Sequence, residues 1–295
     1  LTSREASVIE TARLLRQRLH YLEEGIAGDN KAPEAVRQLV REQAFTILNR
    51  FAAVRMSEER NIIRESIRKG YNSEGFLVYD QLTGGAKTAE QFTRYNWYIG
   101  HVFDELAIDL PAVFDRFSPY ALLFPSEKVL LELLKIINDE DLNIYRESGH
   151  QPTNLWTEDE TIGWIYQYYN SREEISEMRE ASGAPRNSRE LAVRNQFFTP
   201  RYVVQFLVDN SLGRQWIEMT KGQTSLVDSC QYMVKREQEI FLEKGEENPE
   251  AKIEGANYIE YRQIKDPREI LMLDPACGSM HFGLYCFDLF EQIYL

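Results

Sequence analysis

The chain has little cysteine and little histidine for its 295 residues. Its three cysteines, Cys230, Cys277 and Cys286, are an odd number without a paired spacing. That pattern argues against a disulfide framework and favours a reducing, cytoplasmic environment. The four histidines lie far apart, and none pairs with a cysteine at the spacing of a zinc site. The sequence therefore predicts no metal centre.

Long apolar runs and a positive net charge are also lacking. No stretch approaches the roughly 18 apolar residues of a membrane span, so we expect no association with a membrane. Charged residues in the first turns, such as Arg4 and Glu5, are not those of a signal peptide. The net charge of −13 argues against an autonomous nucleic-acid-binding protein, although it leaves room for a local basic face.

The composition is that of a globular protein, and the length is enough for about two domains. Residues 1–180 predict a mainly helical N-terminal domain, because apolar residues recur there at steps of three and four. We interpret these stripes as core-facing. The four glycines of residues 70–88 predict an exposed loop, and the turn-rich residues 181–195 predict a linker.

Residues 196–295 have a different character. Thr199-Pro200, followed by an apolar run that closes at Gly213, predicts a helix with threonine at its N-cap. Residues 214–268 form a polar insertion, and its acidic run predicts a solvated loop because such a composition buries little apolar surface.

The last part of the chain carries the pattern from which chemistry is expected. Residues 270–273 are apolar and predict a buried strand, and residues 281–294 predict a helix. The turn between them holds Asp274 and Gly278, as in a nucleotide-type α/β unit, where ligands lie beyond the carboxyl ends of the strands. The first N–H groups of the helix then face the ligand. The same pattern also occurs as plain architecture, so both interpretations stay open at this point.

A resemblance favours the first interpretation. The segment LDPACGSMHF (273–282) resembles the motif D-P-x-C-G-[ST]-G-x-F that binds S-adenosyl-L-methionine (AdoMet) in amino-group DNA methyltransferases. It departs from that motif at Met280, where the family usually has glycine. The resemblance implies that AdoMet is the cofactor and that its contacts here are Asp274, Pro275, Ala276, Cys277, Gly278 and Phe282. Turn capping by Asp274 and core packing by Phe282 are the alternatives.

A second segment agrees with the first. Residues 195–213 resemble the F-x-T-P element that precedes the AdoMet motif in these enzymes. The resemblance implies that three residues cover the methionine end of the cofactor, namely Phe198, Thr199 and Pro200.

The wider sequence narrows the resemblance to the large adenine methyltransferases of bacterial phage-defence systems of the BREX and DISARM type. The similar segments are AFTILNRFAAVRM (44–56), LFPSE (123–127), GWIYQYYNSREE (163–174) and KDPREILMLDPACGS (265–279). The resemblance implies AdoMet-dependent N6-methylation of adenine in double-stranded DNA, with other phage-defence proteins as further partners. The expected fold is a mainly α N-terminal domain followed by the start of a Rossmann-like α/β methyltransferase domain.

The family's catalytic motif, [NDS]-P-P-[YFW], does not occur in the sequence. Adenine must be flipped out of the duplex to be methylated, and this motif binds the flipped base. We therefore expect residues 1–295 to be the N-terminal portion of a larger enzyme, inactive alone and without a catalytic residue. A fused restriction–modification enzyme and a non-catalytic helical interaction module are the alternatives.

Three arginines of the predicted linker are candidates for contacts with DNA phosphates: Arg186, Arg189 and Arg194. A solvated linker is the alternative interpretation of the same residues.

Overall fold

The structure is a computed structural model. Contacts divide the chain into two compact units, the helical unit Leu1–Asn195 and the C-terminal unit Gln196–Leu295. The predicted domain boundaries stay a prediction, because contacts within one chain do not test whether each part folds alone. No helix in the described part of the chain is both long and apolar enough to cross a membrane. The described residues are 3–26, 31–84, 89–144, 153–170, 172–186, 188–194, 199–249, 253–278 and 280–295.

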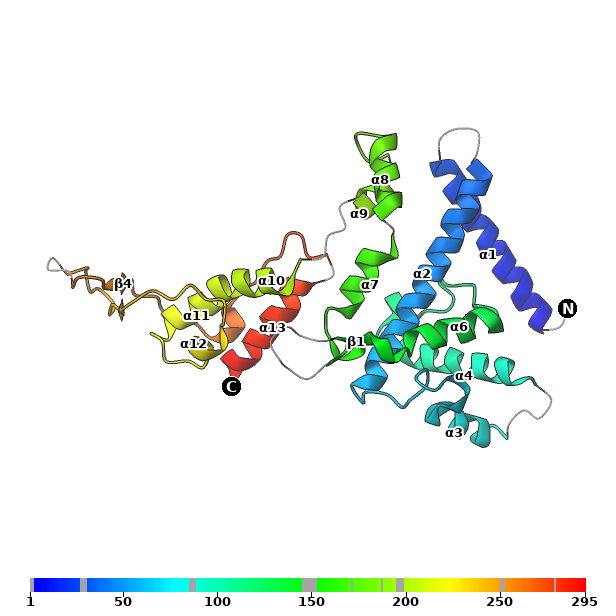
Figure 1. The fold of residues 1–295 in the computed structure, drawn as a ribbon, viewed down its shortest axis with the longest axis horizontal. Helices are drawn as coiled ribbons and strands as arrows, with labels where there is room; N and C mark the ends of the chain where they lie inside the picture. The colour runs from blue at the N-terminus through cyan, green and yellow to red at the C-terminus, as the bar shows by residue number, and fades with distance from the viewer. Residues whose placement is uncertain are drawn as a thin grey trace. The chain divides into compact units, whose positions relative to one another are not determined.

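The helical unit confirms the prediction that the N-terminal part is mainly α (Figure 1). Its only β structure in the described residues is the short antiparallel pair β1 (Asn143–Ile144) and β2 (Thr153–Asn154). Its helices are α1 (Ser3–Gly25), α2 (Lys31–Glu59), α3 (Glu74–Leu82), α4 (Gln91–Leu106), α5 (Pro111–Phe114), α6 (Glu127–Ile137), α7 (Thr161–Tyr169), α8 (Arg172–Ala181) and α9 (Ser188–Arg194), with short 3-10 turns η1 (Gly70–Asn72), η2 (Glu140–Leu142) and η3 (Leu155–Thr157).

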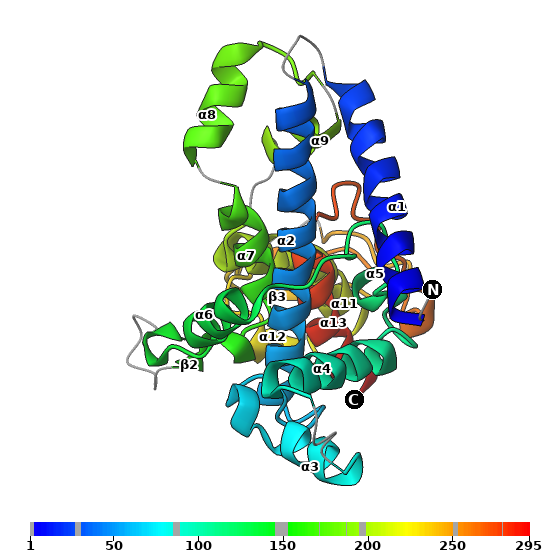
Figure 2. The same ribbon diagram turned by 90° about the vertical axis from the view of Figure 1, so that its right-hand side faces the viewer.

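Helix α2 is the central element of this unit, with α1 beside its first half in both views (Figures 1 and 2). Phe51 and Val54 of α2 are fully buried in the main core, together with residues of α4 and α6. The α1–α2 pair has its own small apolar cluster. It is also joined by the Arg18 guanidinium, which donates two hydrogen bonds of 3.0 Å to the Glu42 carboxylate. The apolar stripes therefore pack into cores as predicted.

Residues 74–82 correct the sequence prediction, since they form helix α3 rather than an exposed loop. Phe76 is buried edge-on against Tyr95, with ring centroids 5.2 Å apart. Gly75 lies so close to Tyr98 that a Cβ at that position would be 2.0 Å from the Tyr98 hydroxyl. The glycine that suggested a loop is there because two helices approach closely. Residues 85–88 of the predicted loop lie outside the described part.

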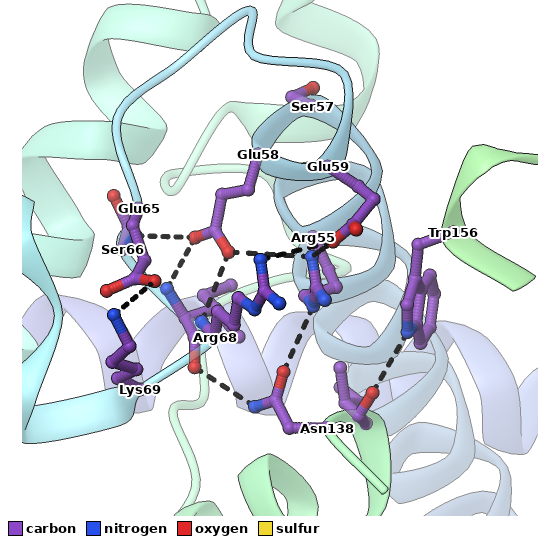
Figure 3. A network of polar contacts seen from close by, with 12 residues as sticks. Arg55, Ser57, Glu58, Glu59, Glu65, Ser66, Arg68, Lys69, Asn138 and Trp156 are labelled. Carbon is purple, nitrogen blue, oxygen red and sulfur yellow. Dashed lines mark hydrogen bonds and ion pairs between the residues drawn. The ribbon is translucent and has the colours of Figure 1, made fainter. Parts of the chain in front are cut away.

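A polar network joins the end of α2 to the chain that follows it (Figure 3). The buried Glu58 carboxylate accepts the backbone N–H groups of Ser66, Ile67 and Arg68. Burial raises the pKa of Glu58, and the three N–H groups partly oppose that shift. The backbone donors thus take over the solvation that the carboxylate loses.

The same network reaches α6 (Figure 3). The Arg55 guanidinium contacts Glu59 at 2.6 Å and donates to Asn138 Oδ1 at 3.0 Å. Asn138 in turn donates to the carbonyl of Ile67 at 3.1 Å. Trp156 anchors the last turn of α6 through a 3.0 Å hydrogen bond from its indole N–H to the carbonyl of Ile137.

The C-terminal unit is smaller, and helices are its main regular structure. A core of apolar side chains from α10, η4, α11 and α13 holds it together. Its elements are α10 (Arg201–Val208), the π-helical turn η4 (Asp209–Gly213), α11 (Arg214–Met219), α12 (Leu226–Ser229), β3 (Glu239–Phe241), β4 (Asn257–Ile259), the 3-10 turn η5 (Pro267–Glu269) and α13 (His281–Tyr294). Strands β3 and β4 pair in parallel.

The end of the helix after Pro200 and the buried strand 270–273 were both predicted wrongly. The helix after Pro200 does not end at Gly213 but continues through η4 into α11. Gly213 is needed inside the helix, because a Cβ there would lie 2.9 Å from Cys230 Sγ. Residues 270–273 are not a buried strand, since Leu271 and Leu273 are 92% and 87% exposed. A strand needs a hydrogen-bonded neighbour, and the described residues offer none to this segment. Strands β3 and β4 lie at the two ends of the segment that was predicted as a solvated loop. The acidic residues of this segment that the structure describes are exposed.

We predict that Glu58→Ala lowers the free energy of unfolding by about 3 kcal/mol, because three buried N–H groups lose their acceptor. Urea denaturation of the whole chain, followed by tryptophan fluorescence and circular dichroism, measures the change. Glu132→Ala, an exposed site on α6, is the control and should change stability by less than about 0.5 kcal/mol. Equal effects of the two substitutions would contradict a structural role for the Glu58 network.

Candidate cofactor site

Helices α10 and α13 contact each other and run in the same general direction, with their axes crossing obliquely (Figure 1). The Tyr285 hydroxyl donates to Asp209 Oδ1 at 2.8 Å. Four residues further along each chain segment, Gly213 faces Leu289, and a Cβ at Gly213 would lie 3.6 Å from Leu289 Cδ2. On both chain segments, the contacting residues follow one another in the same direction along the sequence. The first turns of the two helices are therefore at the same end of the pair. The two predicted cofactor segments lead into those first turns.

The first of these segments is the turn before α13, where Asp274 acts as a cap. Asp274 Oδ1 accepts the backbone N–H of Ala276 at 3.0 Å, which makes an Asx turn. Asp274 Oδ2 is buried and has no hydrogen-bond partner among the described residues. An unpaired buried carboxylate oxygen costs free energy, so this atom is a vacant acceptor for a cationic or N–H group.

A second Asp-Pro turn, eight residues earlier, shows what distinguishes Asp274. Asp266 accepts the backbone N–H of Arg268 at 3.0 Å, in the same Asx geometry. Its other oxygen binds the Arg268 guanidinium at 2.5 Å, and these bonds lower the pKa of Asp266 to about 2. The residue at the equivalent place after Asp274 is Ala276, which brings no cation. The Asp266 turn therefore provides hydrogen-bond donors to both oxygens of its carboxylate. The Asp274 turn leaves one carboxylate oxygen without a partner among the described residues.

The backbone between Asp274 and α13 turns through left-handed conformations. Gly278 has φ +52° and Met280 has φ +67°. A Cβ at Gly278 would meet only the carbonyl oxygen of Ala276 within 4 Å, so the space above this residue is open. Position 280, where the AdoMet motif usually has glycine, thus has the backbone that favours glycine. Ser279 lies outside the described residues.

Side chains around the turn divide into exposed and core-facing groups. Cys277 is exposed, as are Pro275 and Ala276. Phe282 is partly buried against the core of the C-terminal unit, and its contact with a cofactor stays a prediction. Behind it, burial and the negative charge of Asp274 raise the pKa of Cys286 to about 11.

The second segment is the lead into α10. Pro200, not Thr199, takes the N-cap position, and its carbonyl accepts the N–H groups of Val203 and Val204 at 2.9 and 3.2 Å. The predicted threonine cap is therefore wrong, because the helix begins one residue later than its sequence suggests. Thr199 is half-buried, and Phe198 lies outside the described residues. The role of all three in covering a cofactor stays a prediction.

The arginines proposed for DNA make contacts within the helical unit. Arg186 pairs with Glu190, with Nη2 2.5 Å from Oε1. Arg194 donates to the carbonyls of Ser182 and Gly183 at 3.1 and 3.2 Å. The side chain of Arg189 lies outside the described part. Contact of these arginines with DNA stays a prediction.

A buried carboxylate that sequence reasoning missed lies where η4, the continuation of α10, contacts α13. Asp209 is 0% exposed. Besides the Tyr285 hydroxyl, it accepts the backbone N–H of Tyr232 at 2.9 Å through Oδ2. Burial and Asp209 raise the pKa of Cys230 to about 12. An aspartate in the apolar stripe of a helix was the available signal, since a buried acid must find donors.

Two hollows lie elsewhere. An apolar groove of about 380 Å³ separates α2 from α6, lined by Val40, Leu48 and Val129 among others. A hollow of about 650 Å³ lies between η5 and α13, beside Phe287 and Tyr294. No group of three potential metal ligands occurs among the described residues.

Comparison with known proteins shows similarity to adenine-specific methyltransferases, which confirms the predicted resemblance. Over 92% of its length the chain is 25% identical to the adenine-specific methyltransferase PglX of Lacticaseibacillus casei (strain Zhang). Over 48% of its length it is 36% identical to the adenine-specific methyltransferase BrxX of Escherichia coli O9:H4 (strain HS). The chain spans 23% and 11% of the lengths of these relatives. No protein-family model matches.

We predict that one of the three thiols of the native chain reacts rapidly with a disulfide reagent such as DTNB and two react slowly. Cys277 is exposed, whereas Cys230 and Cys286 are buried and have raised pKa values. Stopped-flow absorbance at pH 8 measures the fast and slow phases of the thiol reaction, and Cys277→Ser should remove the fast phase. Two or three fast thiols in the wild-type chain would contradict this arrangement of the turn.

We also predict that glycine stabilises position 280 relative to alanine by about 1 kcal/mol, because φ +67° is strained for a residue with a Cβ. Met280→Gly and Met280→Ala lose the same packing of Met280 against Gly283, so their difference isolates the backbone. Urea midpoints of the two variants provide the comparison. An alanine variant as stable as the glycine variant would show that the turn has another conformation.

Proposed function

We propose that this chain forms the cofactor-binding part of an AdoMet-dependent adenine methyltransferase that acts on DNA in bacterial phage defence. The observation that carries the proposal is the open Oδ2 of Asp274, at a turn with free space over Gly278. The similarity to two adenine-specific methyltransferases supports the reaction class.

The residues of the turn fit AdoMet in charge and shape. AdoMet is a cation with an ammonium group and supplies an activated methyl group when bound. Asp274 would hold a positive or N–H group of the ligand through its vacant oxygen. Gly278 lets ligand atoms approach the backbone, and the first N–H groups of α13 would face them. Thr199 and Pro200 would cover the ligand from the α10 side.

We further propose that the residues that bind the flipped adenine lie outside these 295. The sequence has no two consecutive prolines, which the [NDS]-P-P-[YFW] motif requires. The exposure of Leu271 and Leu273 is consistent with this proposal, since strands of parallel sheets are covered on both faces. Neighbouring strands and helices of a Rossmann-like sheet would bury these leucines and fill the hollow beside Phe287.

A second candidate is a non-catalytic interaction module formed by the helical unit. The apolar groove between α2 and α6 is the observation that favours it, because apolar grooves on helical proteins bind partner helices. Calorimetry with AdoMet separates the two candidates. Binding that depends on Asp274 supports the methyltransferase, whereas no binding by the full gene product favours the module.

We predict that Asp274→Ala weakens AdoMet binding at least about tenfold, the cost of one lost charged hydrogen bond. Calorimetry and protection of Cys277 from a thiol reagent measure binding, both with the full gene product and with this chain. Asp266→Ala is the matched control, because it removes the same Asx turn at a carboxylate that is already satisfied. Transfer of labelled methyl groups into DNA adenine tests the reaction, with activity expected only from the full gene product. The assignment of Asp274 fails if both substitutions weaken binding equally.

A further inference from the structure

The cofactor site as proposed consists of two segments that are far apart in sequence, so something must hold them in register. The lead into α10 and the turn before α13 are more than 70 residues apart in sequence, and the polar insertion 214–268 lies between them. Apolar contacts between α10 and α13 bury area but permit sliding, since dispersion and the hydrophobic effect are non-directional. A directional contact between the helices is therefore the feature that could fix their relative position.

The described residues contain such a contact in the Tyr285–Asp209 hydrogen bond of 2.8 Å. It lies one turn inside α13, close to the proposed site, and its acceptor is fully buried. Burial and the hydrogen bond to Asp209 raise the pKa of Tyr285, so the hydroxyl stays a donor at neutral pH. A slide of one helix by a single residue would break this bond and leave a buried carboxylate oxygen unpaired.

The Asp209 carboxylate is itself held in place by a third segment. Its Oδ2 accepts the N–H of Tyr232. The neighbouring Asn210 side chain continues this attachment, accepting the N–H of Val234 at 2.8 Å and donating to the carbonyl of Tyr232 at 2.9 Å. The backbone of residues 232–234 is thus hydrogen-bonded to the side chains of two successive residues of η4. The acceptor for Tyr285 is fixed by these contacts as well as by its own helix.

The π-helical turn η4 explains how an acid can occupy this place. A π turn inserts one residue into the helical repeat, so the face that packs against a neighbour shifts along the helix. Here the turn places both Asp209 and Gly213 against α13. Asp209 forms a hydrogen bond with Tyr285, and Gly213 allows close approach because it has no side chain. Such turns are frequent at functional sites.

We propose that Asp209 and Tyr285 are positioning residues for AdoMet: their hydrogen bond sets the register of α10 and α13, and so keeps Thr199-Pro200 opposite the Asp274–Gly278 turn. The inference rests on the proposed function. It adds a role for two residues that do not touch the cofactor and that the AdoMet motif does not include.

The test compares Tyr285→Phe with Tyr71→Phe in the full gene product. Both substitutions remove one tyrosine hydroxyl bonded to a carboxylate, since Tyr71 donates to Glu127 at 2.9 Å in the helical unit. We expect Tyr285→Phe to raise the AdoMet dissociation constant roughly tenfold at a temperature where both variants are folded, and Tyr71→Phe to leave it unchanged. A double-mutant cycle with Asp209→Asn should be strongly non-additive in AdoMet affinity.

A second measurement does not depend on AdoMet. Amide hydrogen exchange in the ligand-free protein should become faster in the first turns of α10 and α13 with Tyr285→Phe, relative to the rest of the C-terminal unit. If the wild type binds AdoMet and Tyr285→Phe binds it equally well, the inference is wrong. If the wild type does not bind AdoMet, the proposed function fails. Hydrogen exchange then decides whether the pair sets the helix register, and unchanged exchange in those turns overturns that as well.

Discussion

A carboxylate that is removed from water must be given hydrogen-bond donors, and this constraint organises both units of the chain. In the C-terminal unit, Asp209 takes its donors from Tyr232 and Tyr285, on two other segments. In the helical unit, Glu58 takes three successive backbone N–H groups. Each acid fixes the path of a stretch with little regular structure of its own. In both cases the directional bonds specify the arrangement, and the surrounding apolar cores supply most of the burial.

Asp274 is the exception to this constraint, which is why it stands out. Its turn has the same geometry as the turn at Asp266, yet no arginine follows to satisfy the second oxygen. Proteins rarely leave such an atom unpaired unless a ligand, ion or water completes it. In the proposed function, a cationic or N–H group of AdoMet is the partner of this oxygen.

Much of the fold was predictable from apolar periodicity, and the failures have local causes. Long helices such as α2 bury a continuous stripe, which a sequence shows directly. Glycine misled the prediction twice, at Gly75 and Gly213, where it permits close packing inside or beside a helix and does not end one. The apolar run 270–273 misled it as well, because strand formation depends on a neighbour that local sequence does not reveal. For the candidate site, the motif located the turn at Asp274. It did not show the open oxygen or the left-handed backbone of Met280, since both depend on coordinates.

The exposed apolar residues Leu271–Leu273 also have a consequence for handling the protein. It is an exposed, strongly apolar segment whose backbone groups are not paired to another strand in the described part of the chain. Such a segment is a template on which a second molecule can add its own strand, edge to edge. Where the segment stays uncovered, we therefore expect self-association that increases with protein concentration.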